Sequence, residues 1–115
     1  MTEEAKQESK DKCLCSKCKG IHTVSYSPGA CEAVVACQEC GRLYYSLLYE
    51  RMSFGGGDTL EEYQIPITSE EVETIKTIPY EDLELQFLAG REARLLFAGQ
   101  VSKLDSDSAL KRCGR

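Results

Sequence analysis

The chain has 115 residues, a length that suits one compact domain. With 42% hydrophobic and 29% charged residues, it is too apolar to be a wholly disordered protein. Its formal net charge of −5 at pH 7 repels phosphate backbones, which disfavours a general nucleic-acid binder and favours a basic protein partner.

The first twelve residues are polar and charged, and they predict a disordered tail. They lack the apolar stretch of a secretory signal, and no run in the chain reaches the roughly 18 apolar residues that span a bilayer. We therefore expect a cytoplasmic protein without a membrane partner. In that compartment cysteines bind metal more often than they form disulfides, and the odd count of seven argues against complete pairing.

Four of the seven cysteines form two short hooks, one from Cys15 to Cys18 and one from Cys37 to Cys40. The hooks follow the pattern C-x2-C-x18-C-x2-C, which is typical of a tetrahedral zinc site with four thiolate ligands. We predict one structural Zn²⁺ per chain, bound by these four cysteines. All-sulfur cages also accept iron, which would give an electron carrier, but the hooks lack the proline that is usual in rubredoxins.

The remaining cysteines and the histidine leave some alternatives open. Cys13 offers a third thiol beside the first hook and can replace Cys15 as the ligand. His22 is the only histidine, and we assign it to the surface or to a position behind the ligands. We expect Cys31 to be a small, half-buried side chain and Cys113 to be a free thiol near the C-terminus.

Three β-strands and a turn are predicted around the hooks. Residues 21–26 and 30–36 are β-prone runs on either side of Pro28-Gly29, the pattern of a hairpin that brings the two hooks to one end. Residues 43–54 have apolar side chains on both faces, which predicts a central strand covered on both sides.

A fourth strand is expected over residues 59–67, where Pro66 indicates an edge strand or a strand end. Thr68 and Glu71 have the spacing of a capping box, which predicts the start of a helix that Pro79 ends.

The pattern is less decisive in the last third of the chain. Residues 80–89 predict a further helix that stops at Gly90. Residues 91–99 fit either a short helix or the return strand of a hairpin, and periodicity leaves both open. Residues 102–115 are polar and are expected to form a flexible tail.

The two hooks joined by a hairpin resemble the zinc-ribbon superfamily over residues 13–54. The matching residues are Cys15, Cys18, Gly20, Cys37, Cys40 and Gly41. The resemblance implies a three-stranded ribbon with tetrahedral zinc at its tip. It implies no particular activity, because zinc ribbons occur in proteins of many functions.

These elements together predict an α+β fold. In it, a zinc-ribbon β-hairpin extends into a small antiparallel sheet, and C-terminal helices pack on one face of that sheet. The single domain is expected to cover residues 13–101, between a disordered tail at 1–12 and a flexible tail at 102–115.

The sequence predicts a non-enzymatic protein that binds another protein. It has no base beside a serine or cysteine nucleophile, and the hook thiols are assigned to metal. Residues 61–100 hold nine acids against three bases, which suits a basic protein partner. The tyrosines of the central strand, if exposed among these acids, would extend such an interface. By analogy of charge and size alone, inhibition of a basic enzyme, as by immunity proteins and antitoxins, is one expected mode of action.

The alternative is a nucleic-acid-binding zinc ribbon that acts as a transcription or translation accessory. It rests on bases that can gather near the metal tip. These bases are Lys10, Lys12, Lys17, Lys19, Arg42 and Arg51.

Overall fold

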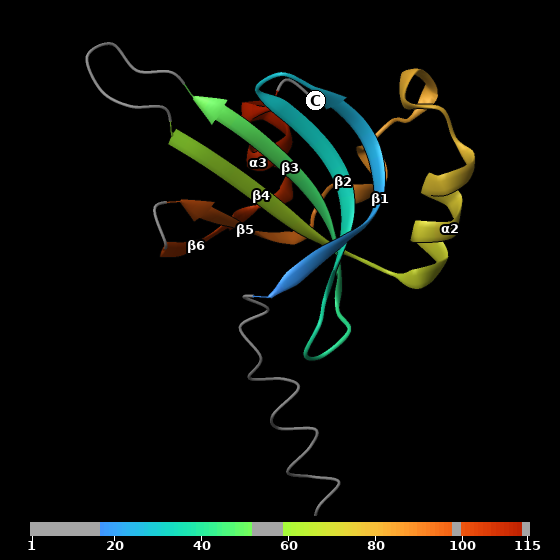
Figure 1. The fold of residues 1–115 in the computed structure, drawn as a ribbon, viewed down its shortest axis with the longest axis horizontal. Coiled ribbons are helices and arrows are strands. Elements are labelled where there is room, and N and C mark those ends of the chain that lie inside the picture. Colours follow the sequence, from blue (N-terminus) through green and yellow to red (C-terminus); the bar gives the residue numbers. More distant parts are fainter. Residues whose placement is uncertain (1–16, 52–58, 98–99, 114–115) are drawn as a thin grey trace, which may run out of the picture.

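The computed structural model describes residues 17–51, 59–97 and 100–113. Its main feature is a six-stranded antiparallel sheet in which each strand pairs with the next one in the sequence (Figure 1). The strands are β1 Cys18–Ser27, β2 Ala30–Cys37, β3 Leu43–Arg51, β4 Thr59–Ile67, β5 Glu92–Phe97 and β6 Gln100–Asp105. The helical elements are α2 Ser69–Thr77, the 3₁₀ turns η1 Tyr80–Asp82 and η2 Gln86–Leu88, and α3 Ser106–Arg112.

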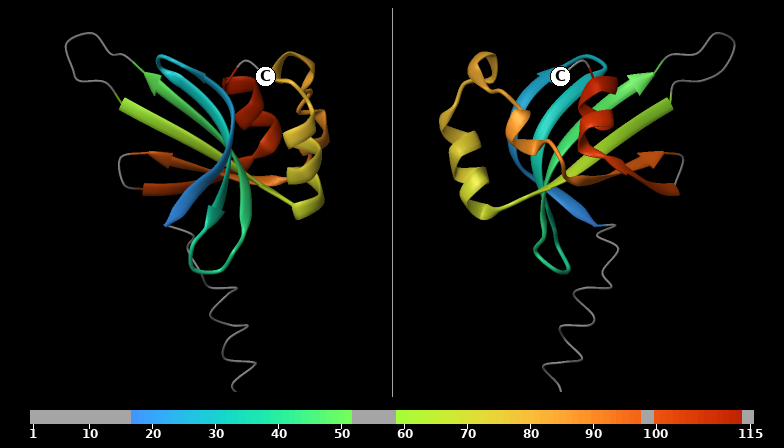
Figure 2. Two further views of the ribbon diagram at one scale, coloured as in Figure 1. Left: turned by 45° about the vertical axis from the view of Figure 1, so that its right-hand side comes forward. Right: turned by 180° about the vertical axis from the view of Figure 1, so that it is seen from behind.

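The helical elements lie on one face of the sheet, which the right-hand view of Figure 2 shows from the helical side. The main core fills the space between these two layers. Tyr45 and Leu47 of β3, Tyr63 and Ile65 of β4, and Ile75 of α2 are among its most buried side chains. No described helix covers the opposite face, which we call the open face of the sheet.

The predicted α+β fold with packed C-terminal helices is wrong, because a six-stranded sheet dominates the described residues and the α-helices among them, α2 and α3, are both short. The segment expected to form a helix at 80–89 makes two 3₁₀ turns instead, with Leu83, Leu85 and Leu88 directed inward. Residues after Gly90 form β5, which pairs with both β4 and β6. Pairing with the free side of β4 outweighs the local helical preference of this stretch.

The N-terminal strands agree with the sequence pattern. The hairpin of β1 and β2 turns at Pro28-Gly29, where Gly29 has a φ of +84°. The strand β4 covers residues 59–67 as predicted, but it lies between β3 and β5 rather than at an edge. Pairing with β5 reaches only as far as Gln64, so Pro66 lies beyond the part of β4 that needs donors on that side. Predicted residues 52–54 of the central strand lie outside the described residues.

The C-terminal residues differ from the expected tail as far as Cys113. They form β6 and α3, and Ala109, Leu110 and Cys113 are buried in the main core. The hydroxyl of Tyr49 donates a hydrogen bond of 2.6 Å to the carbonyl oxygen of Cys113. A few apolar side chains in this polar stretch are enough to hold α3 against the sheet, because the helix is short and packs on the main core.

The capping box predicted for α2 is confirmed. The hydroxyl of Thr68 accepts a hydrogen bond from the backbone N–H of Glu71, and the Glu71 carboxylate accepts one from the N–H of Thr68. The helix buries Val72 and Ile75. Of the helices in the described ranges, none is long and apolar enough to cross a membrane.

An ion pair connects α2 to the start of β5. Arg91 donates hydrogen bonds to both carboxylate oxygens of Glu71, with Nη1 and Oε1 2.8 Å apart. The same guanidinium also donates to the carbonyl oxygens of Pro66 and Phe87. The two side chains are only 27% and 22% exposed, so water screens this pair less than a typical surface pair. The hydrogen bonds from Arg91 lower the pKa of Glu71 from 4.5 to about 2.

This ion pair predicts a specific pH dependence of stability. A carboxylate with a lowered pKa in the folded state stabilises the fold above pH 4.5, and the stabilisation is lost as the pH falls towards 2. We expect Glu71→Gln to lower the free energy of unfolding by about 1–3 kcal/mol at pH 7, because charged hydrogen bonds are lost while the cap remains. The deficit should shrink between pH 4.5 and pH 2 in urea unfolding followed by circular dichroism.

The matched control is Glu73→Gln on the same helix. Glu73 pairs with Lys76 at 3.6 Å, and its side chain is 74% exposed, so its loss should change the stability little. Equal effects of the two substitutions, or a Glu71→Gln deficit that does not vary with pH, would contradict this account of the ion pair.

Candidate metal centre

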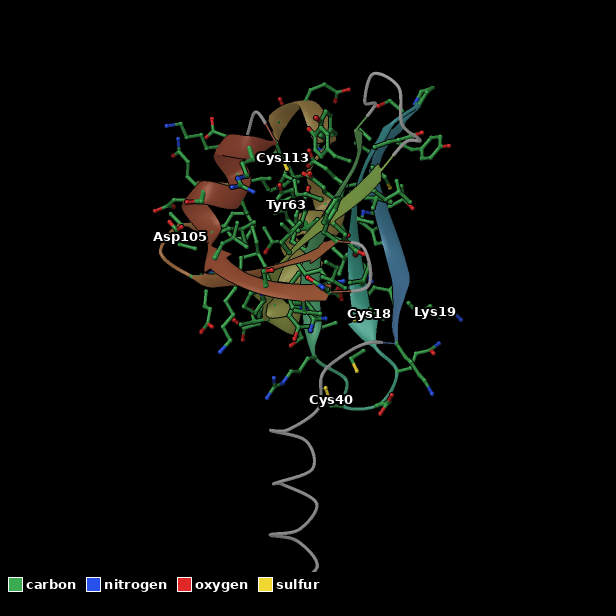
Figure 3. The ribbon with its side chains drawn as sticks, turned by 90° about the vertical axis from the view of Figure 1, so that its left-hand side faces the viewer. Cys18, Lys19, Cys40, Tyr63, Asp105 and Cys113 are labelled. Atoms are coloured by element: carbon green, nitrogen blue, oxygen red, sulfur yellow. The ribbon has the colours of Figure 1, made fainter. Side chains whose placement is uncertain are left out.

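The β1–β2 hairpin places Cys18 directly opposite Cys37. Cys18 and Cys40 pack against a small second cluster made of Val35, Cys37 and Tyr44, separate from the main core. In Figure 3 the side chains of Cys18 and Cys40 lie at the same end of the hairpin, far from Cys113 beside α3. The structure thus places three of the four predicted ligands in one cluster of side chains. The fourth, Cys15, and its alternative Cys13 lie outside the described residues.

The second hook forms a tight turn around the Cys37 sulfur. The backbone N–H of Glu39 points at Cys37 Sγ, with 3.4 Å between nitrogen and sulfur. The N–H of Gly41 donates to the Cys37 carbonyl at 3.0 Å, and the Cys37 N–H donates to the Arg42 carbonyl at 2.8 Å. N–H groups directed at a cysteine sulfur stabilise its thiolate form, which is the form that binds metal.

The two glycines after the hooks differ in their backbone conformation. Gly41 has a φ of +80°, in the region that side-chain-bearing residues rarely adopt. Gly20 lies inside β1 opposite Val35, without a positive φ. Gly41 therefore lies in a turn after the second hook, whereas Gly20 lies in a strand, because β1 is already extended two residues after Cys18.

Arg94 of β5 also belongs to this site. Its Nη2 lies 3.8 Å from Cys18 Sγ, and its guanidinium carbon lies 4.6 Å from the centre of the Tyr44 ring. Gln64 accepts a hydrogen bond of 2.7 Å from Arg94 Nε. Sequence reasoning missed this residue because 76 positions separate it from Cys18, and no local pattern indicates that β5 reaches the first hook.

The electrostatics of the thiols depend on these neighbours. Burial raises the pKa of Cys18 above its ordinary value, and Cys37, Glu62 and Cys40 raise it further, while Arg94 acts in the opposite direction. Burial also raises the pKa of Cys31, which lies opposite Tyr26 at the far end of the hairpin. A divalent cation among the hook thiols would reverse this tendency, because coordination deprotonates cysteine.

In the part of the chain that the structure describes, no group of three or more His, Cys, Asp and Glu side chains is arranged to hold a metal ion. The three hook thiols share one cluster, and their donor chemistry is the all-sulfur set that zinc accepts. His22 is partly buried and pairs with Val34, farther along the hairpin than the thiols.

Comparison of this chain with protein-family models, with curated proteins and with solved structures found no match.

The turn of the second hook can be tested with the two glycines. A Cβ atom at either position meets nothing within 4 Å, so only the backbone conformation distinguishes them. We expect Gly41→Ala to destabilise the fold by about 1 kcal/mol, because its φ is strained for alanine. The control Gly20→Ala should be neutral or slightly stabilising. Urea unfolding measures both, and equal stabilities of the two variants would contradict the assigned turn.

Proposed function

We propose that this chain is a non-enzymatic, zinc-stabilised protein that binds a basic protein partner through an acidic surface on its helical layer. The observation that carries the proposal is the surface of the segment from η1 to η2. Leu83, Leu85 and Leu88 of this segment point into the main core. The residues between and before them are directed outward, so the segment presents its polar and aromatic side chains to solvent.

The acidic surface is defined by five exposed acids and two partly exposed aromatic residues. These residues are Glu70, Glu73, Glu81, Asp82 and Glu84, with Tyr80 and Phe87. Tyr80 is 36% exposed and Phe87 39%, which is high for large apolar side chains. Lys76 is the exposed base on the same helix, so negative charge prevails there. Aromatic side chains within a charged rim are typical of protein interfaces, and the acids favour a partner of positive charge.

The tyrosines of the central strands do not extend this surface. Tyr44, Tyr45 and Tyr63 are buried and Tyr49 is half-buried, so these four tyrosines of β3 and β4 pack in the two clusters. The proposed contact is therefore confined to the helical layer. By size and charge, such a protein would act on a basic enzyme as an inhibitor of the immunity-protein kind, by covering the surface that its target uses.

The proposed zinc has a structural role. The second cluster has three buried members, too few to hold the end of a hairpin through apolar burial alone. A Zn²⁺ bound by Cys15, Cys18, Cys37 and Cys40 would connect β1, the second hook and the chain before β1. Four thiolates and one Zn²⁺ carry a net charge of about −2, which adds to the acidity of the protein.

The zinc site predicts a metal content and its dependence on single thiols. We expect about one zinc per purified chain by elemental analysis, with loss of zinc in Cys37→Ser and Cys40→Ser. Cys31→Ser is the control, because Cys31 lies at the other end of the hairpin and should keep the metal. Comparing Cys13→Ser with Cys15→Ser identifies the fourth ligand. A metal-free wild-type chain prepared without chelators would contradict the site.

The partner surface predicts a loss of binding on charge reversal. Capture from the lysate of the native host, after nuclease treatment, should yield a basic protein in equal stoichiometry with this chain. We expect Glu81→Lys/Glu84→Lys to weaken that complex at least tenfold by calorimetry, because attraction becomes repulsion. The control Glu92→Lys/Asp107→Lys makes the same change in net charge, from −5 to −5 + 4 = −1, on exposed residues of β5 and α3. Equal losses in both variants would indicate an effect of net charge and contradict the surface.

A second function is favoured by one observation, the exposed bases Lys17, Lys19 and Arg42 at the cysteine end of the hairpin. They would suit a nucleic-acid contact at the metal tip. The capture experiment separates the two functions, because nucleic acid that disappears with nuclease, and binding that falls steeply with salt, would favour this alternative.

A further inference from the structure

We propose that Arg94 of β5 is a positioning residue of the zinc centre, where it donates a hydrogen bond to the Cys18 thiolate and offsets the negative charge of the bound metal cage. This inference rests on the zinc site proposed above and adds a residue that lies in neither hook.

Arg94 of β5 contacts the first hook although the two lie far apart in the order of the strands. β1 and β5 are the first and fifth strands of the sheet, with three strands between them, yet Arg94 Nη2 and Cys18 Sγ are 3.8 Å apart. The sheet must therefore fold over on its open face at this end, where Figure 1 shows the start of β1 crossing the strands. At this contact an N–H group of Arg94 faces the sulfur of Cys18.

Neighbouring side chains hold the Arg94 guanidinium in place. Its central carbon lies over the ring of Tyr44, which belongs to the same cluster as the thiols. Gln64, which is 2% exposed, fixes Arg94 Nε through its side-chain oxygen. The Gln64 amide in turn donates to Glu62 at 2.8 Å, and Ser46 donates to the same carboxylate oxygen at 2.7 Å. A donor fixed in this way loses little entropy when a thiolate forms.

The positive charge of Arg94 would offset the negative charge of the proposed zinc cage. A four-thiolate zinc cage carries about −2, and partial burial makes an uncompensated charge costly. Arginine stays protonated at all relevant pH values, and its N–H groups lower the electron density on the sulfur that they contact. Groups behind metal ligands typically change metal affinity by 10–100-fold when they are removed, which sets the expected size of the effect.

The test compares Arg94→Gln with Lys103→Gln, two changes that remove the same charge from neighbouring strands. Lys103 pairs with Arg94 in the β5–β6 ladder, but its side chain is 85% exposed and its ion pair is with Glu92. We expect zinc affinity, measured by competition with a chromophoric chelator, to fall 10–100-fold in Arg94→Gln and to change less than about twofold in Lys103→Gln.

Two further measurements distinguish a role at the metal from a role in folding. Cobalt substituted for zinc should show a shifted sulfur-to-metal absorption band in Arg94→Gln and an unshifted one in Lys103→Gln, because only the first loses a bond to the ligand. Arg94→Lys keeps the charge and should recover part of the affinity, so a variant that folds poorly does not decide the outcome alone.

The inference is overturned if wild-type chain binds zinc and Arg94→Gln matches Lys103→Gln in affinity and in the cobalt spectrum. That result would leave the zinc site itself standing. A wild-type chain that binds neither zinc nor cobalt would overturn both the site and the role of Arg94.

Discussion

The burial of one face of β3 and β4 determines most of the structure. Leu47 pairs with Tyr63 and Tyr45 with Ile65, and all four side chains have no exposed surface. Because side chains alternate along a strand, a shift of one residue would expose this whole set, so the pairing of the two strands is strongly specified. The helical layer covers the same face, and the ion pair between Glu71 and Arg91 holds α2 to the start of β5. The same alternation determines which side chains of β3 and β4 lie on the opposite face of the sheet.

The alternation of side chains along β3 and β4 explains how the cysteine hooks and the distant Arg94 come to lie on the same face of the sheet. With Tyr45 and Tyr63 turned into the main core, Tyr44 and Gln64 must face the open side. Arg94 contacts both residues: its guanidinium lies over the ring of Tyr44, and its Nε donates to Gln64. From the same face, Arg94 Nη2 contacts Cys18 Sγ. The second cluster thus lies on the open face of the sheet, separate from the main core. Weakening it should loosen the hook end without removing the apolar contacts of the helical layer.

Local signals account for the parts of the fold that the sequence predicted. The capping box at Thr68, the Pro28-Gly29 hairpin and the alternation along β4 each involve residues a few positions apart. After residue 80 the structure depends on distant partners: β5 forms because β4 has a free side, and α3 is held by the core that it covers. Neither cause is visible in local periodicity, so the sequence favoured helices and a tail there. The same reason hid Arg94, while the hook cysteines were evident from their spacing.

The proposed acidic surface and the proposed zinc site lie on different parts of the molecule, so each would affect partner binding in a different way. The acidic surface lies on α2 and on the segment from η1 to η2. Cys18 and Cys40 lie at the hook end of the hairpin (Figure 3). Zinc would therefore support binding indirectly, by keeping the folded state populated. Charge on the acidic surface would act directly, on the rate of association and on the choice of partner. This arrangement implies that, once the chain is folded, the affinity of the complex depends on salt but not on the metal.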